Sequence, residues 1–282
     1  MAGASVSSKP GERRSAITRK LLSLIFKIVL LACLAPFANA QITGDAAREL
    51  ALSTVRSKKH IAPDQFLSIH REEELEESLA NVTTGWRRGP ELIYTISQTG
   101  AEIKENSIAW HTVTDGDPTY IVAVNSTDRA AYCIHGCGLR ESLAEFQSLI
   151  AAMKVRLGSP DQAQSLVDFY REVNPQNYEA LAPIMSLLEF KQAAERECHA
   201  GVKSFDAGEA AFNAWWKRAE PLYRAVSFAP DAVAHGDGYQ VEWFVTSSSS
   251  IKSCGGALLQ AQLEVGADGR VGKLTFSSAV DR

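Results

Sequence analysis

The chain has 282 residues, of which 29 are Lys or Arg and 33 are Asp or Glu, so its formal net charge at pH 7 is −4. Hydrophobic residues make up 45% of the chain, enough for a sizeable core in one large domain or two small ones. The acidic balance, with no basic stripe to offset it, argues against binding to nucleic acid or to an anionic membrane surface.

Residues 1–40 have the three parts of a secretory signal peptide. Basic residues gather before residue 21, apolar residues dominate 21–34, and the small-x-small site Ala38-Asn39-Ala40 follows. We predict cleavage before Gln41 and a periplasmic or secreted protein with no further transmembrane segment. Cleavage leaves 23 basic and 32 acidic residues, a net charge of −9. Two alternatives stay open: an uncleaved membrane anchor, although Lys27 interrupts the apolar run, and a lipoprotein modified at Cys33.

Two helices and a group of short strands are predicted first in the mature chain. The helices cover residues 44–57 and the acidic stretch 71–80. The strands cover 92–97, 108–113, 120–124 and 130–134, and turn-forming residues separate them. The strand at 120–124 is apolar on both faces, which is typical of a central position in a sheet.

A helical block follows. Apolar residues recur at helical spacing from Leu139 to Leu157, and Gly158 is expected to end that helix. Ser159 can cap the next helix, with Pro160 at its first position. A third helix is expected from residues 174–175 toward residue 198, kinked at Pro183. Residues 206–209 resemble a capping box, and we expect a helix there whose adjacent tryptophans at 215 and 216 point one into the core and one partly outward.

The chain ends in strands with alternating apolar and polar residues. They cover residues 239–246, 259–265 and 271–276, and Asp268-Gly269 indicates a hairpin with a type I′ turn between the last two. One face of each strand is polar, so this sheet is expected to pack on one side only. The predicted fold is a single α+β domain over 41–282, in which antiparallel strands from the N- and C-terminal parts flank a helical block.

Four cysteines remain after the predicted cleavage. An even number in an exported protein favours two disulfides, and we favour Cys133–Cys137 with Cys198–Cys254 over the other pairings. A metal site is the alternative, because His135 lies between the first two cysteines. The second pair does not form a matching knuckle, so no metal and no cofactor is expected.

Candidate catalytic groups are few. His111 and His135 both fall in the first group of strands, but spacing places no acid beside either. The motif Ser249-x-x-Lys252 and the thiol of Cys254 lack the partners that nucleophilic catalysis needs. We therefore expect a non-enzymatic binding module for a protein, peptide or small ligand. The alternative is a periplasmic hydrolase that uses His135 or His111. A hydrolase should hold a histidine near an acid or hydroxyl in a pocket, whereas a binder should expose an apolar patch or a sheet edge.

Overall fold

A computed structural model describes residues 42–82, 91–98, 119–176, 181–200, 205–247 and 257–280. All the elements below belong to one compact unit, Thr43–Arg282. They are α2 (Gly44–Lys59), β1 (Leu67–Arg71), α3 (Glu73–Val82), β2 (Glu91–Gln98), β3 (Thr119–Asn125), β4 (Ala130–His135), α4 (Leu139–Ala152), α5 (Pro160–Val173), α6 (Leu187–Ala200), α7 (Phe205–Tyr223), β5 (Asp231–His235), β6 (Gly238–Ser247), β7 (Ala257–Gly266) and β8 (Val271–Ser278).

The strands before the helical block form one antiparallel sheet, sheet A, in the order β1-β2-β3-β4. Its two faces are covered by different helices. Alternate residues of β2 and β3 face the core shared with α3, α4 and α5, as Ile93 and its partner Ala123 do. Helix α2 packs on the sheet through its small buried residues Ala47, Ala51 and Val55. It contacts all four strands. This double coverage explains why β3 is apolar on both faces and lies inside the sheet, as predicted.

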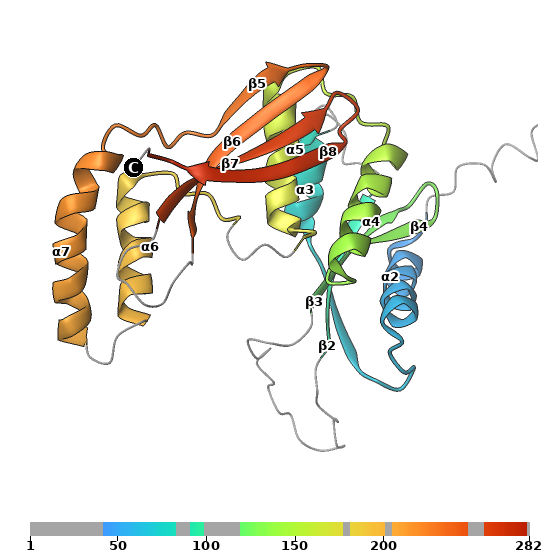
Figure 1. Ribbon diagram of the computed structural model, residues 1–282. Coiled ribbons are helices and arrows are strands. Elements are labelled where there is room, and N and C mark those ends of the chain that lie inside the picture. Colours follow the sequence, from blue (N-terminus) through green and yellow to red (C-terminus); the bar gives the residue numbers. More distant parts are fainter. Residues whose placement is uncertain are drawn as a thin grey trace, which may run out of the picture. The chain divides into compact units, whose positions relative to one another are not determined.

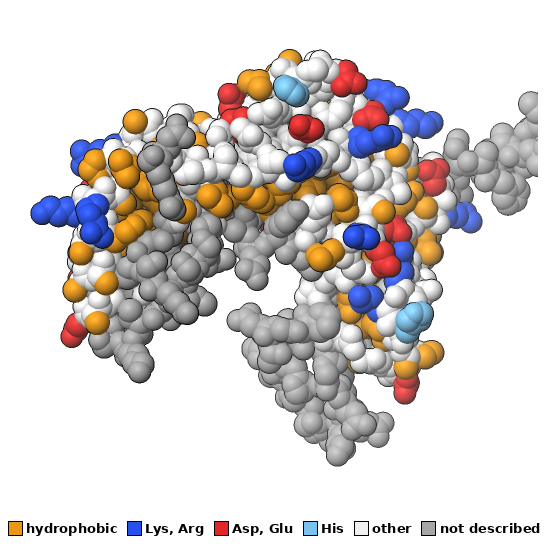
Figure 2. All heavy atoms as spheres, in the orientation of Figure 1, with side chains coloured by type: hydrophobic (Ala, Val, Ile, Leu, Met, Phe, Trp, Pro, Cys, Tyr) orange, Lys and Arg blue, Asp and Glu red, His pale blue; other side chains and the backbone are white. Residues whose placement is uncertain are grey.

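The strands after the helical block form sheet B, also antiparallel, in the order β5-β6-β7-β8. Its inner face carries Val241, Trp243 and Leu263, which join the same core as sheet A, and α5 packs against β5 and β6 (Figure 1). The middle of its outer face is polar. There the Glu242 carboxylate accepts hydrogen bonds from the side-chain amides of Gln240, Gln260 and Gln262. Figure 2 shows this region mostly in white, the colour of the backbone and of side chains that are neither hydrophobic, charged nor histidine. The prediction of one-sided packing holds for this middle part only, because Leu258 on the same face of β7 is buried in a second hydrophobic cluster.

Helices α6 and α7 pack on each other around a second hydrophobic cluster, which includes Leu258 at the start of β7. Phe190 and Phe212 are fully buried there, Trp216 is buried and Trp215 is partly exposed, as expected for neighbouring residues on a helix. The α+β class and the order of strands, helices and strands are thus confirmed. None of the helices that the structure describes is both long enough and apolar enough to span a bilayer.

Several predicted boundaries in the helical block are wrong. The helix from residue 139 ends at Ala152 rather than Gly158, and Lys154 already has a left-handed backbone. Ser159 caps α5 as predicted, but Asn174 ends that helix in the left-handed conformation instead of starting another. The next helix begins only at Leu187, where Ser186 Oγ accepts a hydrogen bond from the amide of Glu189 (3.1 Å). The helix therefore starts at the cap that Ser186 forms inside the predicted segment, and not at residues 174–175.

The strands also show two omissions and one wrong turn type. β1 and β5 are absent from the prediction, and the helix expected from residue 71 starts at Glu73 because Arg71 belongs to β1. The hairpin at Asp268-Gly269 forms, but only Gly269 has a positive φ, +78°, so the turn is not type I′. The strand predicted at 108–113 lies outside the described residues.

Candidate binding site

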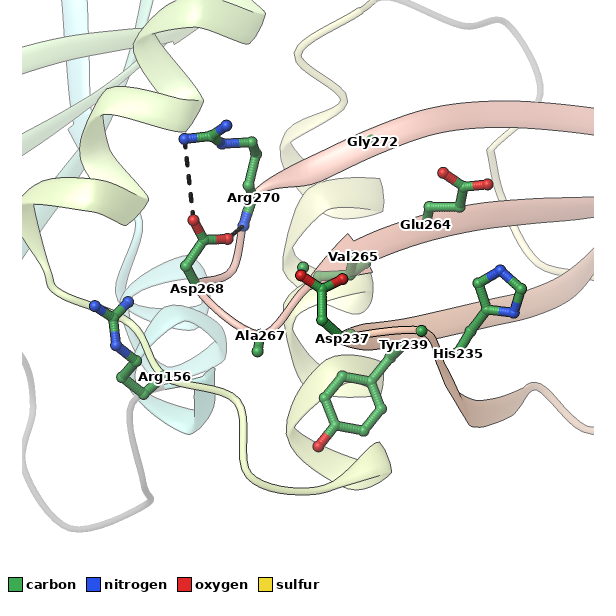
Figure 3. A pocket seen from close by; sticks show the side chains of 13 residues that line it. Arg156, His235, Asp237, Tyr239, Glu264, Val265, Ala267, Asp268, Arg270 and Gly272 are labelled. Carbon is green, nitrogen blue, oxygen red and sulfur yellow. Dashed lines mark hydrogen bonds and ion pairs between the residues drawn. The ribbon is translucent and has the colours of Figure 1, made fainter.

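A hollow with a volume of about 740 Å³ lies at the turn end of sheet B. The β5–β6 and β7–β8 turns form its floor, and the connection between α4 and α5 forms one wall (Figure 3). Its lining is charged, polar or glycine at most positions: Arg156, His235, Gly236, Asp237, Gly238, Tyr239, Glu264, Val265, Gly266, Ala267, Asp268, Arg270 and Gly272.

The two turns have tight, defined geometry. The β5–β6 turn has two central residues, Gly236 and Asp237, and Gly236 takes a positive φ of +60° that glycine adopts without strain. In the β7–β8 turn the Gly266 amide donates to the Arg270 carbonyl (2.8 Å), and Asp268 Oδ1 accepts from the Arg270 amide (3.0 Å). Hydrogen bonds within the β7–β8 turn and the close pairing of His235 with Gly238 therefore hold the floor of the hollow.

Glycines leave the backbone of the floor uncovered. Gly238 on β6 lies directly opposite Gly266 on β7. A Cβ on Gly238 would approach the Val265 carbonyl oxygen to 2.2 Å, so no larger residue fits there. Gly272 on β8 continues this bare region, because a Cβ there would touch Glu264 at 3.1 Å. Close packing between neighbouring strands therefore requires glycine at Gly238, and Gly272 is also tightly packed.

Charged groups of both signs surround this floor. Arg270 is within ion-pair distance of Asp268, at 4.0 Å. Among the described residues, Arg156 donates only to its neighbouring carbonyl at Val155 (3.1 Å), and neither Asp237 nor Glu264 has an ion-pair partner. Figure 3 shows Arg156 on one side of the Ala267 turn and Asp237 on the other. The hollow thus presents an available cation and available carboxylates to solvent.

The residues that the sequence suggested for chemistry lie elsewhere. His135 ends β4, and its Nδ1 is 2.9 Å from the Asn174 carbonyl oxygen at the end of α5. No carboxylate or hydroxyl among the described residues bonds to its ring, so His135 has the environment of a structural histidine. His111 and Ser249 lie outside the described residues.

The cysteines agree in part with the predicted pairing. Cys133 and Cys137 form a disulfide with their Cα atoms 6.0 Å apart, and it joins the end of β4 to the segment before α4. Cys198 is also held in a disulfide and is buried in the α6–α7 cluster. Its proposed partner Cys254 lies outside the described residues, so the second pairing stays a prediction. No group of three potential metal ligands occurs in the part of the chain that the structure covers.

Sequence reasoning missed the hollow, although part of its signal was present. The glycines of the β5–β6 turn flank Asp237, and such a pattern predicts a turn but not that two turns lie side by side. No protein family, no curated protein and no solved structure matches this chain. The site is therefore described by its own geometry alone.

Proposed function

We propose that this protein is an exported, non-enzymatic binding module whose ligand occupies the hollow at the turn end of sheet B. The observation that carries the proposal is the hollow itself, because its volume of about 740 Å³ falls within the range of about 300–1,000 Å³ found for small-ligand sites. A short peptide or a small polar molecule fits that space.

The charges of the hollow favour a zwitterionic ligand such as a short peptide with free termini. Arg156 can bind a carboxylate with two parallel hydrogen bonds, and Asp237 or Glu264 can accept from an ammonium group. Because the hollow is open and its charged groups are exposed, we expect weak binding with strong salt dependence.

Non-enzymatic action is supported by the surroundings of the histidines. His235 lines the hollow but, within the described residues, bonds to no carboxylate or hydroxyl that could make it a general base. His135 lies on a different sheet from the hollow. The hydrolase alternative then depends on His111, which stays a prediction.

Nuclear magnetic resonance of the ¹⁵N-labelled protein tests the proposal. The probes are di- and tripeptides of alanine and glycine, with neutral sugars as the comparison. We expect the peptides to shift the amide signals of Gly236, Gly238, Gly266 and Gly272, while Gly44 on α2 stays unchanged. Mass spectrometry of the same samples should find the peptides uncleaved.

The matched variants are Arg156→Ala, which removes the available cation, and Arg140→Ala, which removes an exposed arginine of α4 outside the hollow. Only the first should abolish the shifts. Shifts that appear away from these glycines, or that survive in Arg156→Ala, would count against the site. Cleavage of the peptides would refute the non-enzymatic binding module and favour the hydrolase alternative.

A further inference from the structure

β5 and β8 are the two edge strands of sheet B. They differ in whether a side chain hydrogen-bonds to their outward-facing backbone groups. At the start of β8, the Gln147 side-chain amide donates to the Val271 carbonyl (2.8 Å) and accepts from the Val271 amide (3.3 Å). No described residue makes such a contact with β5, and four of its five residues are exposed. β5 therefore presents an open sheet edge, at the margin of the sheet in Figure 1.

The pairing pattern tells which backbone groups of β5 point outward. The two-residue turn places His235 opposite Gly238, and such closing pairs exchange hydrogen bonds. The same alternation along β6 directs the carbonyl of Phe244 toward the β5 side, where it accepts from the Ile184 amide (2.7 Å). Because alternate residues face alternate neighbours, the N–H and C=O groups of Ala232 and Ala234 point away from the sheet.

The sequence of this strand is self-complementary when read antiparallel. The strand reads Asp231-Ala232-Val233-Ala234-His235. If a second copy pairs with it antiparallel and the two Val233 residues lie opposite each other, Ala232 of each copy lies opposite Ala234 of the other. These are the residues with outward-facing backbone, so four inter-strand hydrogen bonds can form. Val233 then lies opposite its own copy, and Asp231 lies opposite His235 at both ends.

The side chains agree with this arrangement. Asp231, Val233 and His235 share the outer face of sheet B, and Val233 is 45% exposed. Asp231 lies directly across from Glu242 within the sheet, and like charges in that position are unfavourable. An imidazole on its other side would offset this repulsion, because it carries an N–H donor whether neutral or charged.

We propose that β5 pairs with β5 of a second copy of this chain about a two-fold axis, which joins two four-stranded sheets into one of eight strands. This proposal does not rest on the ligand in the hollow, although His235 also lines that hollow. An added peptide from another protein would use the same edge. The second copy is favoured because Asp231 and His235 stand at the two positions that antiparallel self-pairing brings together.

The contact is small, so the dimer should be weak. Five residues on each side bury less than the roughly 1,200 Å² that stable complexes need, and such contacts are usually transient. We expect a dissociation constant of about 10 μM or weaker, which sedimentation equilibrium of the purified protein measures directly.

The first test removes one outward donor. Ala234→Pro deletes an N–H that faces solvent in the monomer, so the strand still pairs with β6, whereas Ala234→Val keeps the donor and is the matched control. Each dimer loses two hydrogen bonds in Ala234→Pro, and we expect its dissociation constant to rise at least about tenfold. Circular dichroism should confirm that both variants fold.

The second test exchanges the charges. Asp231→His and His235→Asp each place like groups opposite one another and should weaken the dimer about threefold to tenfold. The double exchange restores both pairs and should recover the original constant, which a change in monomer stability alone would not do. A wild-type protein that stays monomeric at high concentration overturns the proposal. So does a dimer that Ala234→Pro leaves intact, or a double exchange that does not recover.

Discussion

Glu91, the first residue of β2, is a buried carboxyl group whose ionisation should oppose folding near neutral pH. Its side chain is 6% exposed and lies opposite Asn125, whose Nδ2 donates to Glu91 Oε1 (3.2 Å). Burial raises the pKa of Glu91 from its ordinary 4.5 to about 7, and the nearby negative charge of Asp128 adds to this. We predict that Glu91→Gln stabilises the protein at alkaline pH.

The magnitude follows from the two pKa values. Each pH unit between the unfolded and folded values corresponds to about 1.4 kcal/mol, so the penalty for ionised Glu91 reaches about 3 kcal/mol. The folded state binds the proton more tightly than the unfolded chain. The penalty is therefore absent below pH 4.5, grows as the pH rises toward 7 and is constant above it. A glutamine resembles the protonated acid and never ionises.

Urea unfolding at about pH 5 and about pH 8 measures the effect. The free energy of unfolding of Glu91→Gln should exceed that of the wild type by about 3 kcal/mol at the higher pH and by less than about 1 kcal/mol at the lower. Glu264→Gln, at an exposed position, is the control and should show no such difference. If Glu91→Gln is no more stable than the wild type at pH 8, burial does not hold this carboxyl group in its neutral form.

Three further tests concern the packing, a helix cap and the disulfides, all by urea unfolding. Gly269→Ala should cost about 2–3 kcal/mol, because its Cβ would meet side chains at 2.7 and 2.9 Å at a φ of +78°, whereas Gly158→Ala meets its nearest neighbour only at 3.5 Å and should cost less than about 0.5 kcal/mol. Ser159→Ala removes the hydroxyl that caps α5 and should cost about 1 kcal/mol. Cys137→Ser opens a short loop and should cost about 2 kcal/mol, and Cys254→Ser, which opens the longer predicted loop, about 4 kcal/mol; the reverse order would refute the pairing.

Much of the fold is predictable because long amphipathic segments carry strong periodic signals. β6 and β7 alternate apolar and polar residues over most of their length, and α5 has both a serine cap and a proline at its first position. β5 escaped prediction because Asp, two Ala and His have little strand propensity. Its conformation depends on its pairing with β6, which a local pattern does not contain.

The candidate site was harder to predict for a related reason. His135 stood out because cysteines and a glycine surround it, yet its hydrogen-bond partner, the Asn174 carbonyl, is far along the chain and chemically inert. The hollow lies where Gly238 and Gly266 meet, and these residues become neighbours only when β6 and β7 pair. Propensity identifies turns, but it does not tell which turns meet in space.

The amide of Gln147 on Val271 has a consequence for how far this protein can polymerise. A sheet with two receptive edges can recruit copies without end and grow into a filament. Here one edge of sheet B begins with backbone groups that a side chain of α4 already satisfies. Pairing through β5 would use up the other edge, so a third copy could join only through β8. Gln147 would then hinder that step at the first residue of β8, and its replacement by alanine would remove this hindrance.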